Sequence, residues 1–193
     1  MNIEMIVIGT SLGGLRALQR ILEDLPPEFS TPIAAVQHRH KSSQSILAQH
    51  LQRSAKIRVR DAENRMPIDP GTLYLAPADY HLMVENGRFL LSTDDAVQYS
   101  RPSIDVLFES AADAYRDNLL GIVLTGANND GSSGAEAIKR RGGTIIVQDP
   151  EEAEAPTMPL GVIARIRPDR VLKLAEIGPW LNGCCHVDAG KHG

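Results

Sequence analysis

The sequence MIVIGTSLGG at residues 5–14 joins a short apolar run to a glycine-rich turn. The run from Met5 to Ile8 is typical of a strand that is buried on both faces. A helical pattern follows from Gly14 to Leu25, with its large apolar residues on one face, and Pro26 and Pro27 stop it. A strand, a tight turn and a helix in this order form the repeating unit of a parallel α/β sheet.

The same alternation continues along the chain. Ser43 is expected to cap a second helix with Ile46, Leu47 and Leu51 on its inward face, and Ser133 with Glu136 fits a capping box. The other expected strands lie at 33–37, 56–61, 119–124 and 144–147, and the other helices at 102–115, 134–140 and 171–181. We therefore predict an α/β fold, a doubly wound and mostly parallel sheet with helices on both faces.

The middle of the chain follows another pattern. Short runs at 73–75, 81–84 and 89–92 are separated by turn residues, and Asn86-Gly87 is a strong hairpin signal. We predict an antiparallel β-hairpin segment, made of these three runs, inserted into the α/β frame. The acidic, proline-containing stretch at 149–159 is predicted to be a loop.

Length and composition fit one ordinary globular domain. The chain has 193 residues, so we expect a domain over 1–182 and a disordered tail at 183–193. The net charge is −4 and aromatic residues make up 4%, which disfavours nucleic acid as a partner. No apolar stretch approaches the length of a membrane span, and the N-terminus lacks the features of a secretion signal.

The cysteines indicate a reducing compartment. Cys184 and Cys185 are adjacent, so they cannot form a structural disulfide framework, and a cytoplasmic location is predicted. Together with His186 and His192 they offer four metal-ligand types in a loose tail, which is weak support for a metal site.

Three residue types of a catalytic triad follow three expected strands, and the carboxyl ends of parallel strands meet at one edge of the sheet. Ser11 lies in a Gly-x-Ser-x-Gly turn, which can expose a nucleophilic serine beside free backbone N–H groups. The same turn can also bind phosphate, or Ser11 can simply cap the helix. His38 is a candidate base with His40 as a competitor, and Asp130 is a candidate orienting acid or part of an ordinary Asp-Gly turn.

Five motifs in a fixed order make a resemblance specific. They are Ile8-Gly9-Thr10-Ser11-Leu12-Gly13-Gly14, Val36-Gln37-His38, Leu75 to His81, Arg101 to Phe108, and Leu124-Thr125-Gly126 with Asp130-Gly131. Over residues 3–181 the chain resembles the catalytic domain of the chemotaxis protein-glutamate methylesterase, CheB. Met158-Pro159 is similar to the Gly-Met-Pro segment of that family.

The resemblance implies a cytoplasmic serine hydrolase without metal or organic cofactor. Its substrate would be the methylated signalling domain of a chemoreceptor, from which it removes glutamate γ-methyl groups as methanol, and deamidation of receptor glutamines is a second expected activity. The resemblance implies Ser11 as nucleophile, His38 as base and Asp130 as orienting acid. The backbone N–H groups of Leu12 and Ala127 would receive the oxyanion.

The sequence also departs from the family pattern. Ala127-Asn128 stands where the family typically has Met-Gly, Arg39-His40 replaces Met-Pro, and Leu12 replaces a common threonine. Asn128 adopts a left-handed backbone less freely than glycine, so we expect an altered site and substrate preference. The family's N-terminal receiver domain is missing from this sequence, so a separate receiver domain or a methyltransferase is an expected partner.

Other residues of the family pattern and the charge distribution permit two interpretations each. His81 is expected to be structural rather than catalytic, and Arg101 is expected either to line the cleft or to precede an ordinary helix start. A run of basic residues without acids lies between Phe29 and Arg60, namely Arg39, Lys41, Arg53, Lys56, Arg58 and Arg60. It would form a basic rim that attracts an acidic receptor helix, or merely a solvated helix face and edge strand.

Two other classes of function stay open from the sequence alone. One is a non-catalytic interaction module that keeps the fold and binds a receptor or methyltransferase, which the change to Ala127-Asn128 would permit. The other is a small-ligand or nucleotide-binding protein that uses the turn at 9–14, although a second phosphate-binding motif is missing.

Overall fold

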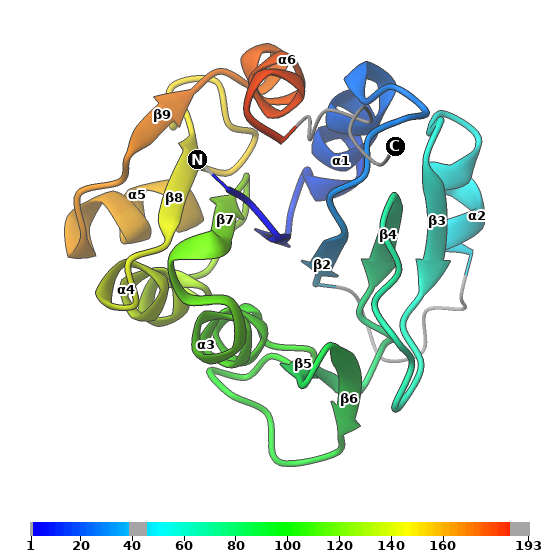
Figure 1. The fold of residues 1–193 in the computed structure, drawn as a ribbon. Helices are drawn as coiled ribbons and strands as arrows, with labels where there is room; N and C mark the ends of the chain where they lie inside the picture. The colour runs from blue at the N-terminus through cyan, green and yellow to red at the C-terminus, as the bar shows by residue number, and fades with distance from the viewer. Residues whose placement is uncertain (1, 39–45, 186–193) are drawn as a thin grey trace.

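The computed structural model describes residues 2–38 and 46–185 and places the expected strands in one sheet (Figure 1). The strands are β1 (Met5–Thr10), β2 (Ile33–Gln37), β3 (Arg58–Asp61), β4 (Thr72–Leu75), β7 (Leu119–Val123), β8 (Thr144–Gln148) and β9 (Arg170–Leu172). Their order is β3-β4-β2-β1-β7-β8-β9, and every neighbouring pair is parallel. The predicted doubly wound, parallel α/β fold is thus confirmed.

Helices cover both faces of the sheet (Figure 1). They are α1 (Gly14–Asp24), α2 (Leu47–Gln52), α3 (Ile104–Tyr115), α4 (Ser132–Arg140), α5 (Thr157–Arg165) and α6 (Leu174–Cys185), and a 3₁₀ turn, η1 (Arg116–Asn118), follows α3. Ile6 and Ile8 of β1 join a core with α1, α2 and α6, whereas Met5 and Val7 join a second core with α3, α4 and α5. The central strand is buried on both faces, which explains its uninterrupted apolar sequence.

The strand order creates one point where the chain changes direction. From β1 the chain continues through α1 to β2 on one side, and after α3 it returns as β7 on the other side of β1. Ligand sites of open parallel sheets lie at such a point, outside the carboxyl ends of the strands. Within residues 2–38 and 46–185, no helix has the length and apolar character that a membrane crossing requires.

The inserted antiparallel segment is smaller than the sequence predicts. The hairpin consists of β5 (His81–Glu85) and β6 (Arg88–Ser92), and Asn86 and Gly87 form its turn with positive φ as expected. The run at 73–75 instead belongs to β4, which pairs in parallel with β2 and β3. All four residues of β4 are buried, and a strand buried on both faces shows no alternation that would reveal its partner.

The C-terminal third differs from the expectation in two elements. The predicted loop at 149–159 ends in the first turn of α5, where Pro159 is tolerated because first-turn N–H groups need no helical partner. The helix expected at 171–181 is preceded by β9 and begins only at Leu174. It continues to Cys185, which is buried, so the ordered chain passes the predicted boundary at residue 182, and 186–193 lie outside the described residues.

Of the two predicted helix caps, the one at Ser133 is not formed, and the one at Ser43 falls outside the described residues. The N-cap of α4 is Gly131, with φ 99°, and Ser133 lies inside the helix rather than capping it. Ser43 lies outside the described residues, α2 begins at Leu47, and the side chain of Ile46 is 58% exposed rather than inward-facing. The cap that α4 lacks locally is supplied by another part of the chain, as described below.

Candidate active site

Backbone hydrogen bonds hold the carboxyl ends of β1, β2 and β7 together. The N–H of His38 donates to the carbonyl oxygen of Thr10 at 3.0 Å, and the N–H of Ser11 donates to that of Thr125 at 3.0 Å. The side chain of Gln37 donates to the carbonyl oxygen of Ser11 at 2.8 Å. Ser11 and His38 are therefore fixed on neighbouring strand ends.

Two glycines are required where the turn after β1 meets the loop after β7. Gly13 has φ 81°, a left-handed conformation that lets the chain enter α1 directly after Ser11. A Cβ at Gly126 would lie 1.8 Å from Sδ of Met158 and 3.0 Å from Cβ of Ser11. The missing side chain of Gly126 thus lets the loop after β7 pack closely against both Ser11 and Met158.

The structure brings His38 and Asp130 into direct contact. Nε2 of His38 lies 2.8 Å from Oδ2 of Asp130, and the side chains are 12% and 0% exposed. Burial by itself would raise the pKa of Asp130, but the hydrogen bond from His38 and those from backbone N–H groups outweigh it and lower the pKa. Asp130 is therefore a carboxylate whose Oδ2 accepts a hydrogen bond from Nε2–H of His38.

Asp130 is held by the first turn of α3. Oδ1 accepts hydrogen bonds from Oγ of Ser103 and from the N–H of Asp105, both at 2.9 Å. Oδ2 accepts from the N–H of Ile104 at 2.7 Å in addition to His38. Both oxygens thus face donors only, and the positive end of the helix dipole adds to the stabilisation of the charge.

A second buried carboxylate, Asp105, caps the neighbouring helix in return. Its Oδ1 accepts from the N–H groups of Gly131 and Gly134 at the start of α4, at 2.9 and 2.7 Å. Its Oδ2 accepts from Nε2 of Gln98 at 2.9 Å. Burial, together with the charge of Asp130, raises the pKa of Asp105 to about 6. Asp130 and Asp105 therefore cap α3 and α4 reciprocally and lock the two helices together.

Ser11 opens into a hollow of about 700 Å³ that His38 and Asn128 also line. No hydrogen bond of Ser11 Oγ is formed with any of residues 2–38 and 46–185. Nδ1 of His38, the ring nitrogen that Asp130 leaves free, is instead 3.0 Å from Nδ2 of Asn128. Ser11, His38 and Asp130 thus lie at one site, and His38 and Asp130 are hydrogen-bonded to each other.

The expected oxyanion donors flank the serine. Leu12 follows Ser11 directly, and Ala127 follows Gly126, whose Cα approaches the serine closely. Within the described parts of the chain, the backbone N–H groups of Leu12 and Ala127 donate to no protein acceptor. Both residues are exposed. Asn128 does not have a positive φ, so its backbone does not need the glycine that the family has there.

Comparison with known families agrees with this geometry. The family model described as CheB methylesterase matches residues 6–181. The chain belongs to the CheB methylesterase family. The crystal structure of the Thermotoga maritima CheB methylesterase catalytic domain superimposes with a TM-score of 0.89 and 35% identity, covering 94% of this chain and 98% of that one.

Relatives of the CheB family differ in length. A Leptospira interrogans protein is 44% identical over 178 residues, which cover 92% of each chain. A Caulobacter vibrioides protein named protein-glutamate methylesterase/protein-glutamine glutaminase 2 is 39% identical over 184 residues, which make up 93% of this chain and 53% of that protein. The CheB-type sequence is thus nearly the whole of one relative and about half of another.

Two remaining residues of the CheB pattern differ in their place: His81 supports the site from outside, and Arg101 lines the hollow. Both ring nitrogens of His81 are occupied, Nδ1 by the N–H of Ser103 at 3.2 Å and Nε2 by the carbonyl oxygen of Asp95 at 3.1 Å, which agrees with a structural role. Arg101 lines the hollow and forms an ion pair with Asp79 at 2.7 Å.

Several other residues of the sequence predictions lie either outside the described residues or away from the site. His40, Arg39, Lys41, His186 and His192 lie outside the described residues. Arg58 and Arg60 lie on the edge strand β3, and Arg60 pairs with Glu63. Cys184 and Cys185 have their sulfur atoms 3.4 Å apart, and within the described chain no three His, Cys, Asp or Glu side chains gather as metal ligands.

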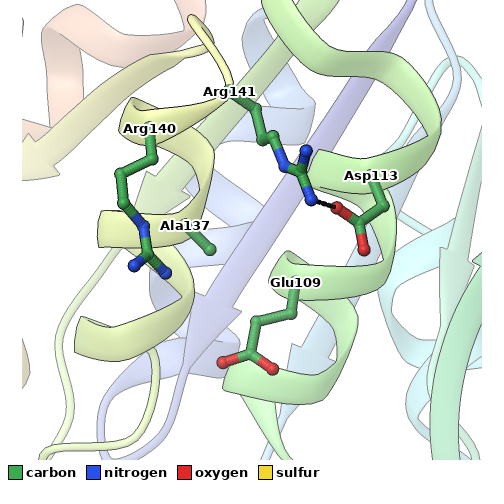
Figure 2. A pocket seen from close by; sticks show the side chains of 5 residues that line it. All are labelled: Glu109, Asp113, Ala137, Arg140 and Arg141. Atoms are coloured by element: carbon green, nitrogen blue, oxygen red, sulfur yellow. Dashed lines mark ion pairs between the residues drawn. The ribbon is translucent and has the colours of Figure 1, made fainter.

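Another hollow, of about 530 Å³, lies between α3 and α4 (Figure 2). Glu109 and Asp113 of α3 face Arg140 and Arg141 at the end of α4, and Arg141 forms an ion pair with Asp113. The lining has no serine, cysteine or histidine, and the paired side chains are 49% and 66% exposed. This hollow therefore lacks the serine and the histidine that line the hollow at the sheet edge.

Sequence reasoning missed the supporting acid. Asp105 was visible in the Arg101 to Phe108 motif, but a helix start explains Pro102, Ser103 and Asp105 well enough by local rules alone. The signal that could have revealed it is an acidic residue in the first turn of a helix whose other side is apolar. Such a carboxylate is buried, and a buried carboxylate needs donors from elsewhere.

Proposed function

We propose that the protein is a protein-glutamate methylesterase, a serine hydrolase that removes the methyl group from glutamate γ-methyl esters of chemoreceptor signalling domains. One observation carries the proposal: His38, which is hydrogen-bonded to the buried Asp130, lines the same hollow as Ser11, on a chain of the CheB family. The names of the relatives support the substrate class.

The reaction begins with Ser11. Its Oγ attacks the carbonyl carbon of the ester, and its proton passes to Nδ1 of His38, because Nε2 is bonded to Asp130. Asp130 holds the ring in the tautomer with the proton on Nε2 and stabilises the imidazolium. The N–H groups of Leu12 and Ala127 hold the oxyanion of the tetrahedral intermediate.

The second half of the reaction restores the enzyme. His38 returns its proton to the leaving methoxide, methanol departs, and the acyl group stays on Ser11. Water, activated by His38, then hydrolyses the acyl-enzyme and leaves a glutamate. A glutamine side chain fits the same sequence of steps with ammonia as the leaving group, which makes the protein-glutamine glutaminase activity in the names of the relatives a second proposed activity.

Methanol release from a methylated receptor signalling domain tests this function directly. The intact protein should release methanol, and S11A should reduce turnover by about a millionfold, to the background of the assay. Arg141→Ala, which alters only the distant hollow between α3 and α4, serves as the matched control and should keep full activity. Release that persists in S11A would refute Ser11 as the nucleophile. No release from several receptors by folded protein would leave a non-catalytic interaction module as the better description.

A further inference from the structure

The side chain of Asn128 makes two hydrogen bonds that fix its orientation. Oδ1 accepts from the backbone N–H of Asp130 at 3.1 Å, and Nδ2 lies 3.0 Å from Nδ1 of His38. A backbone N–H can only donate, so the oxygen of the amide must face Asp130. The NH₂ group must then face His38, and it can only donate to the ring.

This contact defines the state of the histidine. Nε2 donates to the carboxylate of Asp130, and Nδ1 accepts from Asn128, so Nδ1 carries a lone pair. Nδ1 is also the nitrogen that must take the proton of Ser11. In the structure the lone pair that would activate the serine is already engaged, and among the described residues Ser11 Oγ has no hydrogen-bond partner.

We infer that Asn128 is a positioning residue that restrains the reaction proposed above: it keeps His38 in the base tautomer but occupies Nδ1 until the nucleophile reacts. When the proton of Ser11 arrives, Nδ1–H and the NH₂ of Asn128 are two donors facing each other. The amide must leave before His38 can accept the proton. Asn128 lines the hollow of about 700 Å³, so its side chain has space to move away from the ring.

The inference rests on the proposed function, and its test therefore measures the reactivity of Ser11 without a receptor substrate. A fluorophosphonate reacts with an activated serine: the Oγ–P bond forms, the P–F bond breaks, fluoride leaves and the serine proton goes to Nδ1 of His38. Intact-mass measurement gives the rate constant of this labelling, and peptide mapping assigns it to Ser11. S11A is the control for labelling elsewhere.

Two variants separate the contact with His38 from the contact with Asp130. In N128S the shorter hydroxyl can still accept from the N–H of Asp130 but does not reach Nδ1, as Ser and Asn share this turn chemistry. In N128D a carboxylate oxygen still accepts from Asp130, and the second oxygen replaces the NH₂ group facing Nδ1. That oxygen favours a proton on Nδ1 and removes the base.

The expected results have opposite signs. N128S should label about tenfold faster than the wild type, because one hydrogen bond to the base is lost. N128D should label at least about tenfold more slowly. A purely structural role of Asn128 would slow both variants or neither, and thermal unfolding of each variant reports its folding.

Each other outcome is informative. Wild-type labelling at Ser11 with N128S no faster than the wild type overturns the inference and leaves the proposed nucleophile in place. Folded proteins that are never labelled at Ser11 overturn the proposed nucleophile, and the inference with it. The ¹⁵N resonances of the His38 ring in the wild type give a measurement without variants: a proton on Nδ1 at neutral pH overturns the inference.

Discussion

Carboxylates near the two hollows described above lie in very different surroundings. At the sheet edge, Asp130 and Asp105 are 1% and 3% exposed and accept only from fixed donors. Between α3 and α4, Asp113 and Arg141 form an ion pair at the surface (Figure 2). Water screens the attraction between Asp113 and Arg141, whereas the buried Asp130 and Asp105 depend wholly on the protein for the stabilisation of their charge. Burial of the carboxylates, together with the serine and histidine beside them, therefore separates the candidate active site from a surface cleft.

The largest effect expected from this comparison follows Asp130→Asn. Both oxygens of Asp130 accept hydrogen bonds, so the NH₂ group of asparagine must face a backbone N–H on one side or the other. The variant also loses the charge that orients His38. We expect methanol release to fall about ten-thousandfold, as for an orienting aspartate elsewhere. The exposed Asp113→Asn is the control, and a D130N variant that keeps a tenth of the activity would refute an orienting role.

The next largest effect is expected for Asp105→Ala, which should lower the stability of the protein. The substitution leaves the buried N–H groups of Gly131 and Gly134 without an acceptor and uncouples α4 from α3. Unsatisfied buried donors cost about 1–3 kcal/mol each, so the loss of the acceptor for two of them should lower the free energy of unfolding by about 2–6 kcal/mol. Urea denaturation near neutral pH measures it. A loss below about 1 kcal/mol would mean that the reciprocal caps contribute no more than a surface pair.

The pH dependence of stability distinguishes Asp105→Asn from the wild type. Burial raises the pKa of Asp105 from 3.8 to about 6, so the folded protein binds this proton more tightly than the unfolded chain does. Its contribution to stability is therefore present below pH 3.8 and is lost as the pH rises to about 6.

Asn at position 105 does not titrate and keeps an oxygen for Gly131 and Gly134. The stability of D105N relative to the wild type should therefore improve by about 2 kcal/mol between acid and neutral pH. Asp130, whose lowered pKa gives the opposite trend, is present in both proteins, so the prediction concerns only the difference between them. Thermal unfolding of the pair at several pH values measures the effect, and a constant difference would contradict it.

The smallest effect is expected at the surface hollow. Replacing Asp113 or Arg141 by alanine removes one exposed ion pair. We expect each single variant to lose less than about 1 kcal/mol, and the coupling between them to vanish in 1 M salt. A double-mutant cycle by urea denaturation provides the measurement. A coupling energy that is large and independent of salt would show that the Asp113–Arg141 pair is shielded from solvent, as the buried carboxylates are.

Elements formed by local interactions were predictable from the sequence, and elements formed by contacts between distant parts of the chain were not. The strand β1 and the turn at Gly13 were predictable, because an apolar run and a left-handed glycine are local features. The position of β4 was not, because a strand buried on both faces carries no mark of its partners. The predicted capping box at Ser133 was wrong because the cap comes from a distant part of the chain: Asp105 of α3 accepts the hydrogen bond at the start of α4.

The sequence by itself determined the parallel α/β fold, the family and the three residues at the strand ends, because periodicity and short motifs encode local structure. Only the tertiary structure decided which nitrogen of His38 meets Asp130, that Asn128 occupies the other, and that Asp105 supports the pair. These contacts join residues that are 25 to 92 positions apart. No local pattern carries them, because they exist only once the helices have packed on the sheet.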